Sequence, residues 1–120
     1  MRDAQAVERA TIPVEKTRGP IPPLSGTDDQ MWPSPELADI ALRRLEAHHH
    51  PFRHIKYTGA GHLILVPYWP STMRAIGLQV EGFSGYLYSQ GGTPKADAEA
   101  GVDAWANTLA FLENAIRAYR

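Results

Sequence analysis

The sequence predicts an α/β fold in which a few parallel strands are flanked by helices. Residues 21–25 and 52–57 each form a short segment that ends at a glycine-containing loop, which is typical of strands. A helical pattern begins at Ser34, between these two segments, and a longer one follows Thr93. A strand, a helix and a further strand in this order form a βαβ unit, whose strands are parallel.

Composition sets limits on the class of protein. The 120 residues suit one domain with its own hydrophobic core, and 12 basic against 13 acidic side chains leave no basic stripe for nucleic acid. The absence of cysteine excludes disulfides, thiolate metal sites and a cysteine nucleophile within this sequence. The charged first residues do not resemble a secretory signal, and the longest apolar run, residues 63–66, is far too short for a membrane span. We therefore expect a soluble, cytoplasmic protein.

The domain is expected to occupy residues 21–120, after a partly charged lead-in at residues 1–20. Residues 12–15 of the lead-in are expected to be extended, because a residue that precedes proline avoids the helical region. Residues 21–25 stand where a buried strand belongs, but Pro22 and Pro23 cannot donate to a ladder. We expect this strand to be irregular, or its segment to be under relaxed constraint.

The first helix is expected to have Ser34 as its N-cap and Pro35 at its first position. It should end near residues 48–50, because Pro51 cannot continue a helix. Its apolar face is predicted to contain Leu37, Ile40, Ala41 and Leu45.

The last helix should open with Thr93 and Pro94 in the same way. Its apolar residues alternate at spacings of three and four, which predicts an amphipathic helix of about six or seven turns. We expect this stripe to pack into the core. Its members are Val102, Trp105, Leu109, Leu112, Ile116 and Tyr119.

Two loops carry the residues best suited to catalysis. Asp28 and Asp29 follow the first predicted strand, and His62 follows the second. The carboxyl ends of parallel strands share one edge of the sheet, where ligands bind in open α/β folds. In α/β-hydrolases the chain order is nucleophile, acid, histidine, and the acid holds the imidazole in the tautomer that accepts the nucleophile's proton. We predict Asp29 and His62 as such an acid and base; the structural alternative is a turn-capping aspartate beside an ordinary loop histidine.

Other polar groups are weaker candidates. Residues 48–50 are three histidines that point in different directions, and with His54 they lack the spacing of known zinc sites. Positive charge at a helix C-terminus is their simpler role, so we expect no metal and no cofactor. Ser84 follows Gly82 and Phe83, but Tyr86 stands where a nucleophile elbow needs glycine, and this serine comes after the histidine.

Five segments, in this order, resemble the C-terminal catalytic domain of the acyl-CoA thioesterase and bile acid-CoA:amino acid N-acyltransferase family: residues 12–15, 26–33, 59–62, 67–70 and 91–105. The resemblance runs from about residue 7 to the end of the sequence. It implies an α/β hydrolase that attacks the thioester of acyl-coenzyme A with a serine or cysteine and passes the acyl group to water or, in some members, to an amino acid. It also implies Asp29 as the triad acid, with Asp28 as the alternative, and His62 as the triad histidine.

The strands and the elbow that carry the nucleophile in this family have no counterpart in the sequence. We therefore expect the C-terminal part of an α/β-hydrolase fold with an incomplete sheet, inactive alone and acting on acyl-CoA only when completed. The alternative is a non-catalytic interaction module, or one chain of a split hydrolase, that pairs or self-associates through an open sheet edge.

Residues 67–92 are expected to form a long irregular loop near the path of the acyl chain. The aromatic residues of this loop either line that path or pack the loop against the body, and we favour the second interpretation. They are Tyr68, Trp69, Phe83, Tyr86 and Tyr88.

Overall fold

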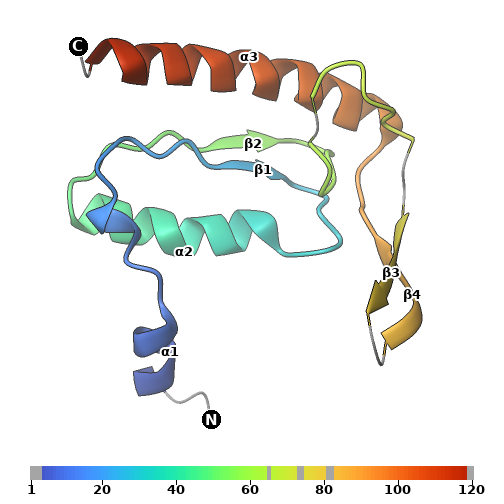
Figure 1. Ribbon diagram of the computed structural model, residues 1–120, viewed down its shortest axis with the longest axis horizontal. Helices are drawn as coiled ribbons and strands as arrows, with labels where there is room; N and C mark the ends of the chain where they lie inside the picture. Colours follow the sequence, from blue (N-terminus) through green and yellow to red (C-terminus); the bar gives the residue numbers. More distant parts are fainter. Residues whose placement is uncertain (1–3, 65, 73–74, 81–82, 119–120) are drawn as a thin grey trace.

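The computed structural model describes residues 4–64, 66–72, 75–80 and 83–118, and its central part has three layers (Figure 1). A parallel sheet of β1 (Leu24–Gly26) and β2 (Ile55–Tyr57) lies between helices α2 (Ser34–Ala47) and α3 (Pro94–Ala118). The predicted α/β class, with parallel strands flanked by helices, is confirmed. The remaining elements are α1 (Ala4–Ala10), the 3-10 helix η1 (Val14–Lys16), β3 (Ala75–Val80) and β4 (Phe83–Ser89).

The two prolines interrupt the first strand on different sides. The N–H of Arg53 donates to the carbonyl of Ile21 (3.2 Å), and the N–H of Ile55 donates to that of Pro23 (3.0 Å). Backbone groups alternate in direction along a strand, so Pro22 faces the opposite edge, which no described strand covers. Pro23 therefore removes one donor from the pairing with β2, and Pro22 removes one from the open edge. The expected irregularity takes this form: a three-residue strand and one isolated bridge, Ile21 with Phe52.

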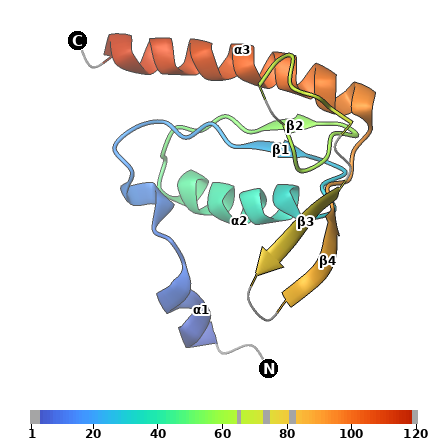
Figure 2. The ribbon, with the colours of Figure 1, turned by 45° about the vertical axis from the view of Figure 1, so that its right-hand side comes forward.

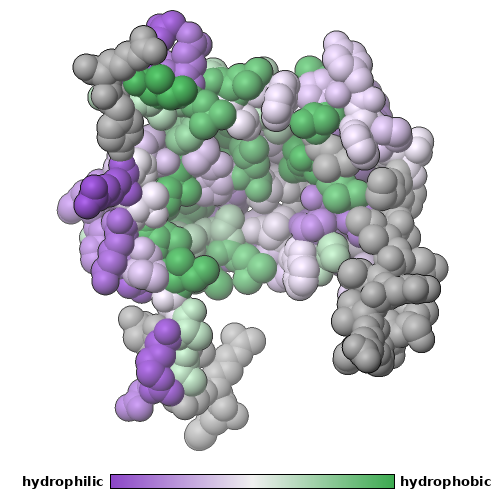
Figure 3. Space-filling view, in the orientation of Figure 1, coloured by the Kyte–Doolittle hydropathy of each residue, from purple (hydrophilic) through white to green (hydrophobic). Residues whose placement is uncertain are grey.

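Helix α2 packs on the sheet through Leu42 and Leu45, which are buried. The predicted apolar face is wrong for Leu37 and Ile40, which stay more than half exposed. Burial on α2 is thus centred on Leu42 and Leu45 and does not extend to these two side chains. Figure 3 shows hydrophobic residues over the face that runs from α3 across the sheet to α2.

The ends of α2 follow the predicted signals only in part. The helix ends at Ala47 with His48 as its C-cap, within the expected range. Ser34 is not the N-cap, however, because the helix already includes it and the cap position belongs to Pro33. The Ser34 hydroxyl instead reaches the carbonyl of Gly26 (3.5 Å) and the carboxylate of Asp29. A tertiary contact has thus replaced the local cap.

Helix α3 begins as predicted, since the hydroxyl of Thr93 accepts the N–H of Ala96 (3.1 Å). The helix crosses the other face of the sheet and is buried through small residues, among them Ala100 and Ala104. The prediction that its large apolar stripe packs in the core is wrong for the five described members, which are 43–58% exposed: Val102, Trp105, Leu109, Leu112 and Ile116. Tyr119 lies outside the described residues.

The geometry of the helix explains this error. Val102 and Trp105 each follow a buried residue by one position, Gly101 and Ala104. One position is about 100° around an α-helix, so the stripe lies on the flank of α3 and not beneath it. Periodicity identifies an apolar face correctly, but it does not say what covers that face.

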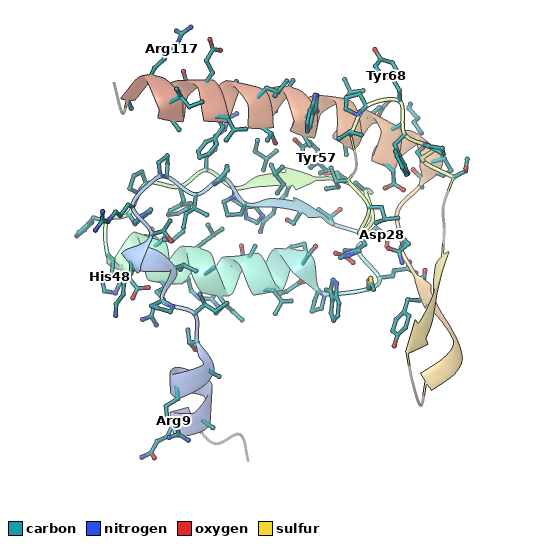
Figure 4. The ribbon with its side chains drawn as sticks, in the orientation of Figure 1. Arg9, Asp28, His48, Tyr57, Tyr68 and Arg117 are labelled. Carbon is teal, nitrogen blue, oxygen red and sulfur yellow. The ribbon has the colours of Figure 1, made fainter. Side chains whose placement is uncertain are left out.

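A tyrosine joins the end of β2 to α3. The hydroxyl of Tyr57 donates to Oδ2 of Asp103 (2.9 Å), and Figure 4 shows its side chain between the two elements. Burial, together with the hydrogen bond and the charge of Asp103, raises the pKa of Tyr57 from 10.0 to about 12.

This raised pKa predicts a loss of stability at high pH. Because the folded pKa exceeds the unfolded value, the contribution is complete below pH 10 and disappears as the pH rises to about 12. Between pH 8 and pH 12, we expect the free energy of unfolding to fall by about 1 kcal/mol more in the wild type than in Tyr57→Phe. This value is lower than the full pKa shift implies, because solvent screens the interaction. Urea unfolding of both proteins at pH 8 and pH 12 measures this difference. Parallel curves for the two proteins would contradict it.

The segment predicted as one irregular loop contains an antiparallel hairpin. Strands β3 and β4 pair with Ile76 opposite Tyr88 and Leu78 opposite Tyr86, so the loop prediction is wrong for 75–80 and 83–89. The overlooked signal is Gly82 between two runs of β-forming residues. The hairpin projects away from the three layers (Figures 1 and 2), and β4 leads back to the sheet through residues 90–92.

The lead-in is partly helical. The expectation of extended chain is wrong for Val14 and Glu15, which lie in η1, because the restriction imposed by Pro13 acts on the residue before it. The carboxylate of Glu15 forms a two-pronged ion pair with Arg44 of α2, in which Nη2 lies 2.9 Å from Oε1. The hydrogen bond from Arg44 lowers the pKa of Glu15 to about 2. Among the described residues, no helix is both long and apolar enough to cross a bilayer.

Candidate functional site

The two loops that follow β1 and β2 lie against each other at the carboxyl ends of the strands. The N–H of Thr27 donates to the carbonyl of Tyr57 (3.0 Å), and the N–H of Asp28 donates to that of Ala60 (2.9 Å). The hydroxyl of Thr27 also accepts the N–H of Gly59 (2.9 Å). Figure 4 labels Asp28 at this end of the sheet. The acid loop and the histidine loop are thus joined through their backbones.

A third segment completes this end of the molecule. After β4, the carbonyl of Gln90 accepts the N–H of His62 (2.7 Å), and Gly91 forms an antiparallel bridge with Asp29. The N–H of Gly92 donates to both the carbonyl (3.1 Å) and Oδ2 (2.8 Å) of Asp28. Sequence reasoning did not assign these residues to the site. The pair of adjacent glycines was the available signal, and both have positive φ, 67° and 71°.

The three segments pack so closely that side chains are excluded. A Cβ atom on Gly26 would overlap the carbonyl oxygens of Ala60 and Gly61. A Cβ atom on Gly61 would in turn overlap Gln90 and Gly91. The position of the site residues is therefore set by contact between backbones.

This packing brings Asp29 and His62 together. Nδ1 of the imidazole lies 3.0 Å from Oδ2 of the carboxylate. The side chain of Asp29 is 2% exposed, and that of His62 is 28% exposed. The second carboxylate oxygen, Oδ1, accepts the N–H groups of Met31 (2.9 Å) and Trp32 (3.0 Å). The edge of the Trp32 ring meets the imidazole, with 6.2 Å between ring centroids.

The charge on Asp29 determines which imidazole nitrogen carries the proton. Burial raises the pKa of this carboxyl, but hydrogen bonds from the Trp32 N–H, from His62 and from Ser34 outweigh it, so the pKa is lowered. An ionised carboxylate only accepts hydrogen bonds, which makes Nδ1 of a neutral His62 the donor. Nε2 then presents a lone pair, and no described residue hydrogen-bonds to it. The arrangement can accept a proton at Nε2 and stabilise the resulting imidazolium.

Asp28 does not share this contact. Besides accepting the N–H of Gly92, its carboxylate accepts the side-chain amide of Gln30 (3.4 Å). Of the two aspartates left open by the sequence, the structure pairs Asp29 with His62.

A family model described as BAAT / acyl-CoA thioester hydrolase C terminal matches residues 2–118. The chain belongs to this family. Acyl-coenzyme A thioesterase 6 of Homo sapiens is 37% identical over 106 residues, which are 87% of this chain and 24% of that protein. The same enzyme of Mus musculus is 35% identical over 106 residues, 88% of this chain and 24% of that protein. Peroxisomal succinyl-coenzyme A thioesterase of Mus musculus is 37% identical over 102 residues, 84% of this chain and 23% of that protein.

The predicted resemblance to this thioesterase family is therefore confirmed. The chain spans about a quarter of the length of the relatives named above. The matched region contains all three segments that form the site.

The remaining predicted groups lie elsewhere. Nε2 of His50 bonds to the carbonyl of Thr17 (2.8 Å), whereas Nε2 of His54 bonds to the hydroxyl of Ser25 (2.8 Å). Within the described ranges, no three His, Asp or Glu side chains gather in a way that would hold a metal ion. Ser84 belongs to strand β4 and not to a turn from a strand into a helix.

Three aromatic side chains of residues 67–92 are described, and all three are at least partly exposed. Tyr68 is fully exposed and points away from the molecule (Figure 4), and Trp69 and Tyr88 are about half exposed. The interpretation that these rings pack the loop to the body is therefore wrong for Tyr68. The side chains of Phe83 and Tyr86 lie outside the described part of the structure.

Proposed function

We propose that this chain is the C-terminal part of an α/β hydrolase that cleaves acyl-CoA thioesters, with Asp29 as its acid and His62 as its base. The observation that carries the proposal is the 3.0 Å contact between Nδ1 and Oδ2 at the carboxyl end of a parallel sheet. The buried Asp29, its lowered pKa and the partly exposed side chain of His62 all suit a general base held in one tautomer. Membership of the thioester hydrolase family supplies the substrate class.

In the first half of the reaction, which forms the acyl-enzyme, His62 accepts one proton and then returns it. Nε2 of His62 takes the proton of a hydroxyl or thiol as that group attacks the thioester carbonyl. The imidazolium, stabilised by Asp29, returns the proton to the sulfur of coenzyme A as the carbon–sulfur bond breaks. Water, or an amine in an acyltransferase, then attacks the acyl-enzyme with the same assistance from His62.

The nucleophile is proposed to come from polypeptide other than these 120 residues. The sequence has no cysteine, and Ser84 follows the histidine and lies in β4. In an α/β hydrolase the nucleophile precedes both partners. The relatives are about four times as long as the matched region, so they contain ample polypeptide for an elbow strand and helix.

A second candidate function is a non-catalytic interaction module or the partner chain of a split hydrolase. It is favoured by two features: the open edge of β1 and the exposed apolar stripe on the flank of α3. Either surface would be stabilised by covering it with another polypeptide.

Activity of the chain alone and of a completed chain tests the proposal. The purified chain, folded by circular dichroism, should release no coenzyme A from a medium-chain or long-chain acyl-CoA beyond a His62→Ala control. A chimaera should hydrolyse these substrates, and lose that activity in His62→Ala. In this chimaera, the chain replaces the matching region of human acyl-coenzyme A thioesterase 6. We call this chimaera the completed enzyme.

The isolated chain and the chimaera together distinguish the hydrolase from the interaction module. Turnover by the isolated chain that disappears in His62→Ala would locate the nucleophile within the chain or its oligomer. A chimaera that folds and binds acyl-CoA but gives no turnover would contradict the catalytic assignment and favour the interaction module.

A further inference from the structure

A buried carboxylate that the proposed chemistry does not use lies behind the histidine loop. Asp97 belongs to the first turn of α3 and is 7% exposed. Its Oδ1 accepts the N–H of Gly61 at 2.7 Å, one residue before His62. Its own N–H donates to the carbonyl of Thr93 (2.9 Å), which fixes Asp97 in the helical turn. Aspartate is seldom buried without a partner, and here a backbone amide of the site loop is a partner.

The space for this contact depends on a glycine. A Cβ atom on Gly92 would overlap both Oδ1 of Asp97 and the backbone nitrogen of Gly61. The missing side chain thus lets the carboxylate reach the loop. Two successive amides are then held by different elements: that of Gly61 by Asp97, and that of His62 by the carbonyl of Gln90.

We propose that Asp97 is a positioning residue for His62. Through the Gly61 amide, it fixes the backbone from which the imidazole extends to Asp29. A charged acceptor forms a hydrogen bond about twice as strong as a neutral one, and a carboxylate is also favoured in the first turn of a helix. This inference rests on the proposed function, because it concerns the orientation of the proposed base.

The tautomer of His62 tests this role without requiring turnover. Long-range ¹H–¹⁵N spectra of the histidine-labelled chain at pH 8 distinguish protonated Nδ1 from protonated Nε2, and His62→Gln assigns the signals. We expect the wild type and Asp97→Asn, which keeps an acceptor oxygen, to be protonated on Nδ1. In Asp97→Ala this preference should be lost. Glu99→Gln is the matched control, because Glu99 lies one half-turn away in α3 and its side chain is exposed.

The outcomes separate the two proposals. A folded Asp97→Ala that keeps the wild-type tautomer would overturn the role of Asp97. If Asp97→Ala does not fold, hydrogen exchange at the Gly61 amide decides: it should be at least about fivefold faster in Asp97→Asn than in the wild type, and equal rates overturn the inference. If Asp29→Asn also leaves the tautomer unchanged, the proposed acid–base pair fails. If only Asp29→Asn alters it, the acid–base pair stands and Asp97 does not position it.

Discussion

Asp29→Asn should lower kcat of the completed enzyme about 10⁴-fold, the size of effect seen when the acid of such a triad is replaced by its amide. The amide can donate to Nδ1 of His62, which moves the imidazole proton to Nε2 and removes the lone pair that accepts a proton. Oδ1 of the asparagine still accepts the N–H groups of Met31 and Trp32, so the loop should keep its shape. Steady-state kinetics with an acyl-CoA substrate measure the loss.

Asp28→Asn is the matched control for this prediction. Its carboxylate bonds to Gly92 and Gln30 and not to His62, so we expect kcat to change by less than about tenfold. A large loss in Asp28→Asn beside a small one in Asp29→Asn would reverse the assignment of the acid.

Gly91→Ala should reduce the free energy of unfolding by about 2–5 kcal/mol, a large fraction of the stability of a domain of this size. Gly91 has φ of 67°, which costs an alanine about 1–2 kcal/mol. The new Cβ would also overlap the backbone of Asp28, and such overpacking costs typically 1–3 kcal/mol. Urea denaturation followed by circular dichroism measures the change.

Gly59→Ala separates these two costs. Gly59 has almost the same φ, 71°, but a Cβ there would meet only the Cβ of Ala96, at an ordinary 3.7 Å. We expect this variant to lose about 1–2 kcal/mol, the backbone cost alone. Equal losses in the two variants would show that the close approach of Gly91 to Asp28 adds nothing to stability.

The contact between Asp29 and His62 could be predicted from sequence because the evidence for it is local. Asp29 and His62 each follow a short strand, and strand ends in a βαβ unit meet by topology. Asp97 could not be found in this way. Its partner, Gly61, is 36 positions away, and the contact exists only because Gly92 leaves room for it.

The errors about the fold also have a common physical cause. The apolar faces of α2 and α3 were identified from periodicity, but their burial depends on what packs against them, and that is not encoded in either helix. Ser34 carries a good capping side chain, yet the carboxylate of Asp29 competes for it. Local sequence patterns favour a conformation, but tertiary contacts can override that preference.

The position of Pro22 has a consequence for colloidal behaviour. A second molecule that paired with the open edge of β1 would meet N–H donors at Leu24 and Gly26. It would meet none at Pro22, the preceding residue that faces this edge. Growth of a cross-β ladder needs a longer uninterrupted row of donors, and proline is a common means by which natural sequences prevent it. The outer edge of β1 can therefore stay accessible without itself providing a template for fibrils.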